Sequence, residues 1–207
     1  MKEEPKSASV KIFGIPQSRA LRCLWMAREL GVAHENVQVH FTKARESPEL
    51  MQINPNARIP AIEDGDFRLY ESMAINFYLA KKYGARSDIA PTSLEDEART
   101  IQWNFWVMTE IEKPLLTIML HTVGMRPSDD ATLAQCKQEL DRPLAVLNAE
   151  LAAKDWIFGN KFTVADLNVA SVMVWAKTAK LDMAAYPRVA DWLRRCMERP
   201  AFRAKNS

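Results

Sequence analysis

The residues with the clearest chemical potential lie in one segment, between Asn54 and Ser72. Pro60 opens the apolar run Pro-Ala-Ile. A proline at the first position of a strand donates no ladder hydrogen bond and is a candidate for a cis peptide bond. Asp64-Gly65 is a hairpin turn signal, and Glu71 and Ser72 follow at the expected start of a helix, where unpaired N–H groups attract anions. Together these features predict a site for a small extended peptide that carries a carboxylate.

The elements that must position this segment alternate through the first half of the chain. Strands are predicted over residues 10–13 and 36–41, with a helix that begins at a cap on Ser18 and stops at Gly31. A short helix after Ser47-Pro48, the hairpin and a helix over residues 71–83 complete the order β-α-β-α-β-β-α. That order predicts a mixed four-stranded sheet with helices packed on it, a thioredoxin-like domain.

The second half of the chain has helical spacing throughout. A turn-rich linker is expected over residues 85–92, between a domain at 10–84 and an all-helical domain at 93–207, with a frayed tail at 1–9. Helices are predicted over 94–121, bent at Pro114, and over 129–152, with Pro143 as a possible kink. Thr163 and Asp166 form a capping box before a third, buried helix, and a fourth runs from Pro187 to Arg199.

Composition excludes several classes of function. The 28 basic and 26 acidic residues give a net charge of +2 without a long like-charge run, which argues against a nucleic-acid partner. The uncharged runs are too short for a membrane helix, and no signal peptide is visible. Three cysteines, odd in number and far apart, suit a reducing, cytoplasmic location. The three histidines lack metal-ligand spacing, so no metal is expected.

The pattern Asn-Pro, Ile-Pro-Ala, Asp-Gly and Glu-Ser, downstream of an Ile-Phe-Gly strand, resembles the glutathione-binding half of the cytosolic glutathione transferases. The resemblance extends from Val10 to about Pro200, and the signature near Asp166 belongs to it. It implies the two-domain fold of that family, an N-terminal thioredoxin-like βαβαββα domain followed by a C-terminal helical bundle. It also implies glutathione as a co-substrate.

The resemblance assigns the catalytic role to Ser18, at the position of the catalytic serine in theta-like and related serine-type members. Its hydroxyl would donate a hydrogen bond to the glutathione sulfur and favour the thiolate. On the residues alone, an ordinary helix cap is the simpler interpretation of Ser18. Cys23 is the rival nucleophile, because some relatives use a cysteine. It falls inside the first helix, where a buried cysteine is normally inert.

The resemblance also implies the contacts that hold glutathione. Ser72 and the helix N–H groups would take the γ-glutamyl carboxylate, and Glu71 would help hold the ammonium group. The backbone of Ile59, beside a cis bond to Pro60, would pair with the cysteinyl residue. Arg58, where lysine is usual, would meet the glycyl carboxylate. Lys43 lies in a loop one residue shorter than the common form and is expected to be a solvated charge.

A hydrophobic co-substrate is expected near an aromatic cluster on the long helix. Trp103 and Trp106 could line such a pocket, with Phe13 and Pro16 across from them. Aromatic residues at helical spacing are more often part of a core, so at most one of the two tryptophans is expected to line it.

These residues predict a glutathione transferase that conjugates the thiolate to a hydrophobic electrophile. Peroxide reduction, dehalogenation or isomerisation with glutathione is an alternative, and a non-catalytic interaction module is another. The family resemblance further implies a homodimer. The sequence supports a dimer modestly, since one small core cannot bury all of four apolar residues of the hairpin and the following helix, Phe67, Met73, Phe77 and Tyr78.

Overall fold

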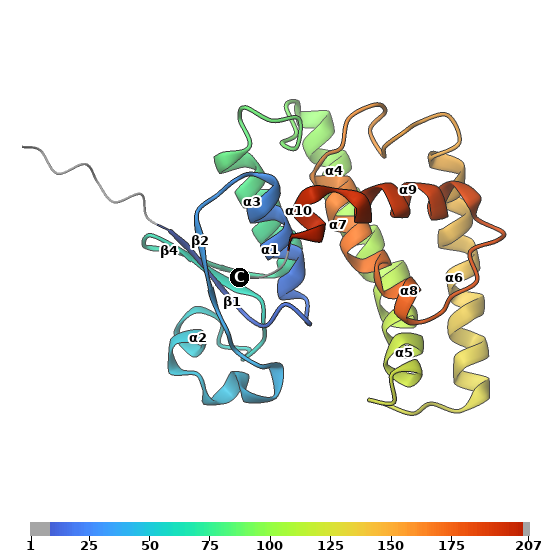
Figure 1. The fold of residues 1–207 in the computed structure, drawn as a ribbon, viewed down its shortest axis with the longest axis horizontal. Coiled ribbons are helices and arrows are strands. Elements are labelled where there is room, and N and C mark those ends of the chain that lie inside the picture. Colours follow the sequence, from blue (N-terminus) through green and yellow to red (C-terminus); the bar gives the residue numbers. More distant parts are fainter. Residues whose placement is uncertain (1–8, 205–207) are drawn as a thin grey trace, which may run out of the picture. The chain divides into compact units, whose positions relative to one another are not determined.

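Two structural units make up the chain in the computed structural model, which describes residues 9–204 (Figure 1). The first unit ends at Ala90 and the second spans Pro91–Arg203, with Ala204 grouped with the first. The frayed tail expected at 1–9 lies almost entirely outside the described residues.

The first unit has the expected order of elements around a four-stranded sheet. The strands run in the order β2-β1-β3-β4, with β1 parallel to β2 and antiparallel to β3, and β3 antiparallel to β4. The predicted thioredoxin-like arrangement is therefore confirmed. Its elements are β1 (Val10–Phe13), α1 (Ala20–Glu29), β2 (His34–Val37), the 3₁₀ helix η1 (Phe41–Glu46), α2 (Pro48–Ile53), β3 (Ala61–Asp64), β4 (Phe67–Tyr70) and α3 (Ser72–Tyr83).

Alternation along β1 divides the side chains between two layers. Phe13 is fully buried in a cluster with Leu50 and Ile53 of α2. Lys11, two residues earlier, points the same way and forms an ion pair with Glu49 of α2 at 3.3 Å. Ile12 is buried on the opposite face, which α1 and α3 cover (Figure 1). The sheet thus lies between α2 on one side and α1 with α3 on the other.

The second strand and the first helix differ from prediction at their ends. The strand predicted over 36–41 is wrong in its bounds, because β2 pairs with β1 in a parallel register that matches Val10 with His34 and Phe13 with Val37. Beyond Val37 the chain turns, and the side chain of His40 accepts a hydrogen bond from the Thr42 N–H at the start of η1. Helix α1 begins at Ala20, two residues after the predicted cap.

The hairpin turn is displaced by one residue from the predicted Asp64-Gly65. Asp64 pairs with Phe67 as the last rung of the ladder, so Gly65-Asp66 forms the two-residue loop. The Asp64 carboxylate is buried and accepts hydrogen bonds from three side chains of α3, at 2.9 Å from Tyr78, 2.8 Å from Lys82 and 2.8 Å from Tyr83. This cluster fixes the C-terminal half of α3 to the hairpin.

The second unit is helical throughout, as expected. Its elements are α4 (Leu94–Trp106), a π-helical turn η2 (Val107–Ile111), α5 (Glu112–Thr122), α6 (Asp130–Glu150), α7 (Val164–Met173), α8 (Trp175–Thr178), α9 (Pro187–Glu198) and α10 (Pro200–Arg203). The irregularity in the long first helix is a wide π-helical turn just before Pro114, the residue at which the bend is predicted. Proline has no N–H and crowds the preceding turn, and a π turn relieves both constraints.

Helix α7 is the buried centre of the second unit. All ten of its residues are buried, and the predicted capping box of Thr163 and Asp166 is present. The Asp166 carboxylate also accepts hydrogen bonds from the Ile157 N–H at 2.8 Å and from the Trp192 indole at 3.0 Å. Burial raises the pKa of Asp166, and these donors oppose that rise. One carboxylate thereby joins α7, α9 and the preceding loop.

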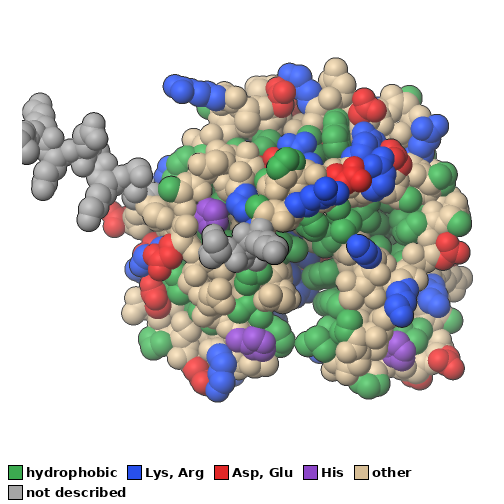
Figure 2. Space-filling view, viewed as in Figure 1, with side chains coloured by type: hydrophobic (Ala, Val, Ile, Leu, Met, Phe, Trp, Pro, Cys, Tyr) green, Lys and Arg blue, Asp and Glu red, His purple; other side chains and the backbone are tan. Residues whose placement is uncertain are grey.

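Surface charge, helix hydropathy and the grouping of possible metal ligands are further features of the described residues. On the face shown in Figure 2, Lys and Arg side chains lie among acidic and apolar ones. None of the described helices is both long and apolar enough to cross a membrane. Among residues 9–204, no three His, Cys, Asp or Glu side chains come together as metal ligands would.

Removing the charge of Asp64 should destabilise the protein in a pH-dependent way. We expect Asp64→Asn to lower the free energy of unfolding by about 1.5–3 kcal/mol at pH 7, because three hydrogen bonds lose their charged acceptor. Burial raises the pKa of Asp64, but hydrogen bonds from Lys82, Tyr83 and Tyr78 outweigh it and hold the pKa below its ordinary value. Stability from a lowered carboxyl pKa is complete above the unfolded-state pKa of about 3.9 and is lost as pH falls through the folded-state value.

The measurement is urea denaturation followed by circular dichroism between pH 7 and pH 3. The difference between wild type and Asp64→Asn should shrink below about pH 4. Asp66→Asn, a change in the exposed part of the same turn, should leave the unfolding free energy nearly unchanged. Equal stability of wild type and Asp64→Asn at pH 7 would show that the cluster contributes nothing.

Candidate functional site

Three segments of the first unit converge at one end of the sheet. In the strand register, Phe13 lies opposite Ala61 and Ala61 lies opposite Tyr70. The residues that extend these strands are therefore neighbours: Gly14 after β1, the Ile59-Pro60 bond before β3, and Glu71 after β4. The predicted site residues of the first unit come from these three segments.

The N-terminus of α3 combines a strained residue with a buried hydroxyl. Glu71 precedes the helix with φ 73° and ψ 111°, a conformation that costs a non-glycine residue about 1–3 kcal/mol and is typical of functional sites. Ser72, the first residue of α3, is only 5% exposed. The first N–H groups of a helix have no acceptor within it, so this end favours an anion.

A buried arginine stands beside that helix end. Arg22 of α1 is 1% exposed, and its Nη1 donates to Ser72 Oγ at 3.2 Å. Since Arg22 uses the serine oxygen as an acceptor, the hydroxyl proton of Ser72 is directed elsewhere and is available for a bound carboxylate. Asn76 of α3 donates to the Arg22 carbonyl at 3.3 Å, which fixes the two helices to each other at this point.

The loop before β3 presents an open stretch of backbone. The Ile59-Pro60 bond is cis, as predicted from the sequence. Among the described residues, neither the N–H nor the carbonyl of Ile59 has a backbone hydrogen-bond partner. Buried Asn54 supports the loop, since its Nδ2 donates to the Arg58 carbonyl at 2.8 Å and its Oδ1 accepts from the Asn56 N–H at 3.1 Å. An extended peptide could pair with Ile59 as a further strand.

Glycine is required at position 14, because the space at this end of the sheet does not accommodate a side chain. Its φ is 130°, and a Cβ there would lie 2.7 Å from the Cβ of Ala20 and 3.1 Å from Ile59. The close approach brings the start of α1 and the Ile59-Pro60 loop together.

Ser18 lies in the turn between Gly14 and α1, and its hydroxyl is used locally. The Oγ donates to the Ile15 carbonyl at 2.6 Å and accepts from the Ala20 N–H at 3.1 Å. The hydroxyl therefore serves the turn before α1, and the predicted N-cap at Ser18 is one residue too early, because the N-cap of α1 is Arg19. The Ser18 hydroxyl is half-buried, and rotation about χ1 would redirect its proton.

Cys23 is unsuited to act as a nucleophile. Its side chain is fully buried on α1, and its Sγ lies 4.0 Å from the Ser72 carbonyl. Burial strongly raises the pKa of the Cys23 thiol, with a smaller opposing effect from the charge of Arg22. A thiol that stays protonated and inaccessible is not reactive.

Arg58 and Lys43, the two basic residues considered for the glycyl carboxylate, are both exposed. Arg58 lies in the loop before the cis bond, where its guanidinium can meet a ligand carboxylate. Lys43 forms an ion pair with Glu46 at 2.8 Å, and both side chains are more than 60% exposed. Lys43 is therefore a solvated loop charge, as the sequence suggested.

The four residues expected around a hydrophobic co-substrate differ in burial. The prediction that Phe13 lines the pocket is wrong. Phe13 is a fully buried core residue, because β1 turns its side chain toward α2. Pro16 is half-buried in the loop after β1. In the second unit, Trp103 is 7% exposed and Trp106 is half-buried, with the two rings edge to face at 4.8 Å. Trp106 is the more accessible of the pair.

Sequence analysis did not predict a role for two buried residues that hold the site in place, Arg22 and Asn54. Each carries a signal that could have been used. Arg22 is a charge within the otherwise apolar stretch Leu21–Ala27, and Asn54 directly precedes a proline where a side-chain turn is common. Their partners, however, come from other elements or from the loop geometry, which local patterns do not give.

Comparison with known proteins finds a family match in each of the two units. The sequence matches the description "Glutathione S-transferase, N-terminal domain" over residues 8–81 and "Glutathione S-transferase, C-terminal domain" over residues 108–200. The first match includes every site residue of the first unit named above.

Relatives and a solved structure agree with these matches. Glutathione S-transferase 3 of Zea mays is 31% identical over 94% of this chain and 92% of its own length. Elongation factor 1-gamma of Equus caballus is 27% identical over 95% of this chain, which spans only 46% of that relative. The structure of a glutathione S-transferase-I bound with lactoylglutathione is 28% identical, with a TM-score of 0.81 over 94% of this chain and 97% of that one.

Proposed function

Because the chain belongs to the glutathione S-transferase family, we propose that it binds glutathione and conjugates the thiolate to a hydrophobic electrophile. The observation that carries the proposal is the end of the sheet where Ser72, backed by Arg22, lies beside the open backbone of Ile59. The related structure with lactoylglutathione supports the choice of ligand.

In this proposal glutathione is held at three points. Its γ-glutamyl carboxylate accepts from the Ser72 hydroxyl and the first N–H groups of α3, and Glu71 receives the ammonium group. Its cysteinyl residue pairs with the Ile59 backbone next to Pro60, as an added strand would. The exposed guanidinium of Arg58 meets the glycyl carboxylate.

Ser18 is the proposed catalytic residue of a serine-type enzyme. On binding, its Oγ–H leaves the Ile15 carbonyl and donates to the sulfur. Lowering a thiol pKa of about 8.5 by roughly two units requires ~2.7 kcal/mol. A hydrogen bond to a charged group supplies about 1.5–3 kcal/mol and a nearby helix N-terminus about 0.3–1. The thiolate then attacks an electrophilic carbon, forming a C–S bond as a leaving group departs or as an activated double bond accepts the electron pair.

Other glutathione chemistry could use the same thiolate, namely peroxide reduction, dehalogenation or isomerisation. A different class of function, a non-catalytic module, is favoured by two observations: the similarity to elongation factor 1-gamma and the local use of the Ser18 proton. Absence of glutathione binding in calorimetry together with absence of turnover would contradict the transferase and favour that second function. The proposed cytoplasmic location is supported by three cysteines that are all buried and form no disulfide among the described residues.

A homodimer is the proposed assembly, and each unit offers an apolar surface for it. In the first unit Phe67 and Tyr70 are exposed on the edge strand β4. In the second unit Leu94, Ile101 and Phe105 form an exposed stripe along α4. Of the four apolar residues named from the sequence, Met73 is buried at 8% exposure and Phe67 is exposed, whereas Phe77 and Tyr78 are half-buried. A two-fold dimer in which the first unit of one subunit meets the second unit of the other would cover both surfaces.

Replacing Ser18 tests the catalytic assignment. Ser18→Ala should lower kcat with 1-chloro-2,4-dinitrobenzene by about ten- to hundredfold, the effect of losing one donor to a developing charge. Glutathione affinity should change much less. Ser18→Thr, which keeps the hydroxyl, should retain more activity, and Cys23→Ala should be close to wild type. Full turnover in Ser18→Ala combined with an inactive Cys23→Ala would reverse the assignment.

Replacing Ser72 tests the position of the glutathione site. Calorimetry should show that Ser72→Ala weakens glutathione binding by about 1–3 kcal/mol, because a bound carboxylate loses a donor. Ser47→Ala is the matched control, since Ser47 caps α2 by accepting from the Leu50 N–H at 3.3 Å and lies in the same unit. Ser47→Ala should lower the free energy of unfolding but leave the affinity for glutathione unchanged. Unchanged affinity in Ser72→Ala would remove the carboxylate from this helix end.

Sedimentation equilibrium tests the dimer. Wild type should sediment at twice the chain mass of 23.6 kDa at micromolar concentration. Phe105→Asp should shift the equilibrium toward the monomer, because it places a charge in the apolar stripe of α4. Arg99→Asp, a surface change on the same helix, should have a smaller effect. A wild-type mass that stays near 23.6 kDa would contradict the proposal.

A further inference from the structure

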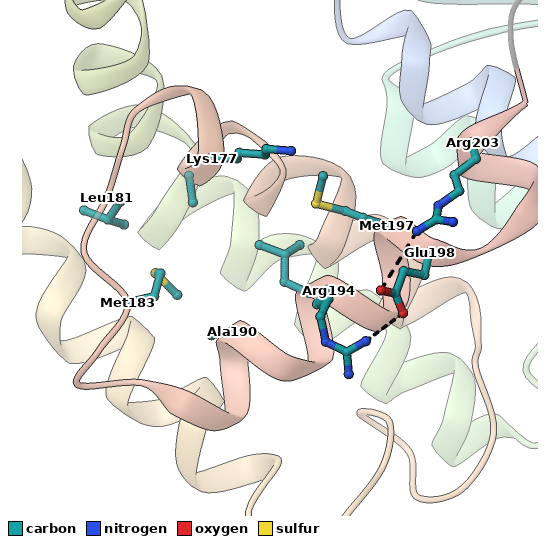
Figure 3. Close-up of a pocket in the computed structure, with 10 residues that line it drawn as sticks. Lys177, Leu181, Met183, Ala190, Arg194, Met197, Glu198 and Arg203 are labelled. Carbon is teal, nitrogen blue, oxygen red and sulfur yellow. Dashed lines mark hydrogen bonds and ion pairs between the residues drawn. The ribbon is translucent and has the colours of Figure 1, made fainter.

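The second unit has a groove along α8, α9 and α10, with a volume of about 450 Å³ (Figure 3). The Glu198 carboxylate in its lining lies 2.7 Å from Arg194 and 3.9 Å from Arg203. Because these charges are paired with one another, they do not select a ligand. The polar contacts at the end of β1, by contrast, lead to a residue with a proposed chemical role.

Both backbone polar groups of Gly14 are bound by β2, one of them through a side chain. The Gly14 N–H donates to the Val37 carbonyl at 2.9 Å, which continues the parallel ladder beyond β1. The Gly14 carbonyl instead accepts from Asn36 Nδ2 at 2.7 Å. The same Nδ2 donates to the Ile12 carbonyl at 3.1 Å. One side-chain amide therefore ties the end of β1 to the first residue of the loop that leads to Ser18.

Asn36 supplies a donor that the backbone of β2 does not offer. Strand β2 ends at Val37, and among residues 9–204 no backbone N–H donates to the Gly14 carbonyl. A parallel ladder spaces its bonds evenly, so the next donor would come from the chain beyond Val37, which turns toward η1. The Nδ2 group of Asn36 takes that place in the ladder.

The surroundings of the Asn36 amide fix its orientation. The Ile12 and Gly14 carbonyls are both acceptors, and only the NH₂ end of the amide carries donors. The Oδ1 atom is buried and has no hydrogen-bond partner among the described residues. A buried oxygen of this kind offsets much of the stability that the two donated bonds contribute. The net contribution of Asn36 to stability is therefore small, and its distinctive effect is its hold on Gly14.

The position of Gly14 determines that of the Ser18 hydroxyl through two peptide groups. The Gly14 carbonyl and the Ile15 N–H belong to one planar peptide, so the bond from Asn36 fixes the plane from which Ile15 continues. The Ile15 carbonyl accepts from the Ser18 N–H at 3.1 Å and from Ser18 Oγ at 2.6 Å. A shift of the Gly14 carbonyl would thus move the turn in which the hydroxyl is held.

Gly14 needs such a restraint more than another residue would. Its φ of 130° lies in a region that glycine alone enters readily, and glycine has the widest conformational freedom of any residue. Packing against Ala20 and Ile59 restrains the Cα of Gly14. The bond from Asn36 restrains the peptide that follows.

We propose that Asn36 is a positioning residue for Ser18 in the reaction with glutathione. By holding the Gly14–Ile15 peptide, it keeps Ser18 Oγ within hydrogen-bond reach of the thiol sulfur. This role rests on the proposed transferase function. A displacement of about 1 Å at a reacting group can cost about 100-fold in rate. Loss of positioning should therefore lower kcat and raise the pKa of the bound thiol, with little change in affinity for glutathione.

Asn36→Leu tests this role, because leucine has a similar shape and no donor. It should lower kcat with 1-chloro-2,4-dinitrobenzene by about tenfold, while the dissociation constant of glutathione changes by less than about twofold. The pKa of the bound thiol, read from the ultraviolet absorbance of the thiolate, should rise toward its free value. A merely structural role would not move that pKa while affinity is retained. Asn36→Gln, which keeps the amide on a longer side chain, should recover part of the activity.

Gln38→Leu is the matched control, because Gln38 carries an exposed amide just beyond β2. It should match wild type in every measurement. Wild-type kcat and thiol pKa in Asn36→Leu would overturn the proposal, and so would an equal loss of kcat in Gln38→Leu. If Asn36→Leu fails to fold, Asn36→Ala carries the same test, since it only removes atoms from a half-buried position on an edge strand.

Amide hydrogen exchange distinguishes failure of this role from failure of the transferase function. The Ser18 N–H bonds the Ile15 carbonyl and the Ala20 N–H bonds Ser18 Oγ, so both report on the turn without glutathione present. Both should exchange faster in Asn36→Leu than in wild type. Faster exchange in a protein that does not bind glutathione would contradict the transferase alone and support the hold of Asn36 on the turn. Unchanged exchange at both groups would overturn the proposal whatever the activity.

Discussion

The buried guanidinium of Arg22 joins the two halves of the candidate site. Its Nη1 donates to Ser72 Oγ, and its backbone carbonyl accepts from Asn76, so α1 and α3 meet through polar contacts inside an apolar layer. Isolated buried charges are costly, and hydrogen bonds of this kind are what make them tolerable. Because Ser18 precedes α1 and Glu71 precedes α3, the contact also fixes the distance between the Ser18 end and the Glu71 end of the candidate site.

Backbone geometry, more than side-chain chemistry, shapes the surface that would face the ligand. Gly14 permits the close approach of α1 and the Ile59 loop, and Asn54 holds that loop through two backbone hydrogen bonds. Ala57, in the same loop, has φ 53°, and Glu71 has φ 73°. Two non-glycine residues in left-handed conformations within one site indicate that the surrounding contacts outweigh local preference.

The two units differ in how a single carboxylate stabilises each. Asp64 lies at a hairpin turn and is held by side chains near the surface, where Lys82 is 43% exposed. Asp166 is fully buried and serves the backbone of a capping box together with the Trp192 indole. The stabilisation by Asp64 depends on its charge pair with Lys82 and therefore on pH. The stabilisation by Asp166 depends mainly on hydrogen bonds from N–H donors. Both acids appear in the sequence as simple turn or cap signals, and their tertiary partners give them wider roles.

Local periodicity, proline and short-range hydrogen bonds are enough to predict the order of elements, the division into a mixed and a helical half, the cis bond between Ile59 and Pro60 and the capping box at Thr163. The face of β1 that Phe13 occupies, the end of β2, the burial of Asp64 and the contact of Arg22 with Ser72 depend instead on packing between elements. Side-chain contacts such as those from Arg22 to Ser72 and from Asn76 to Arg22 join residues 50 and 54 positions apart, and no local pattern contains that information or the strand register.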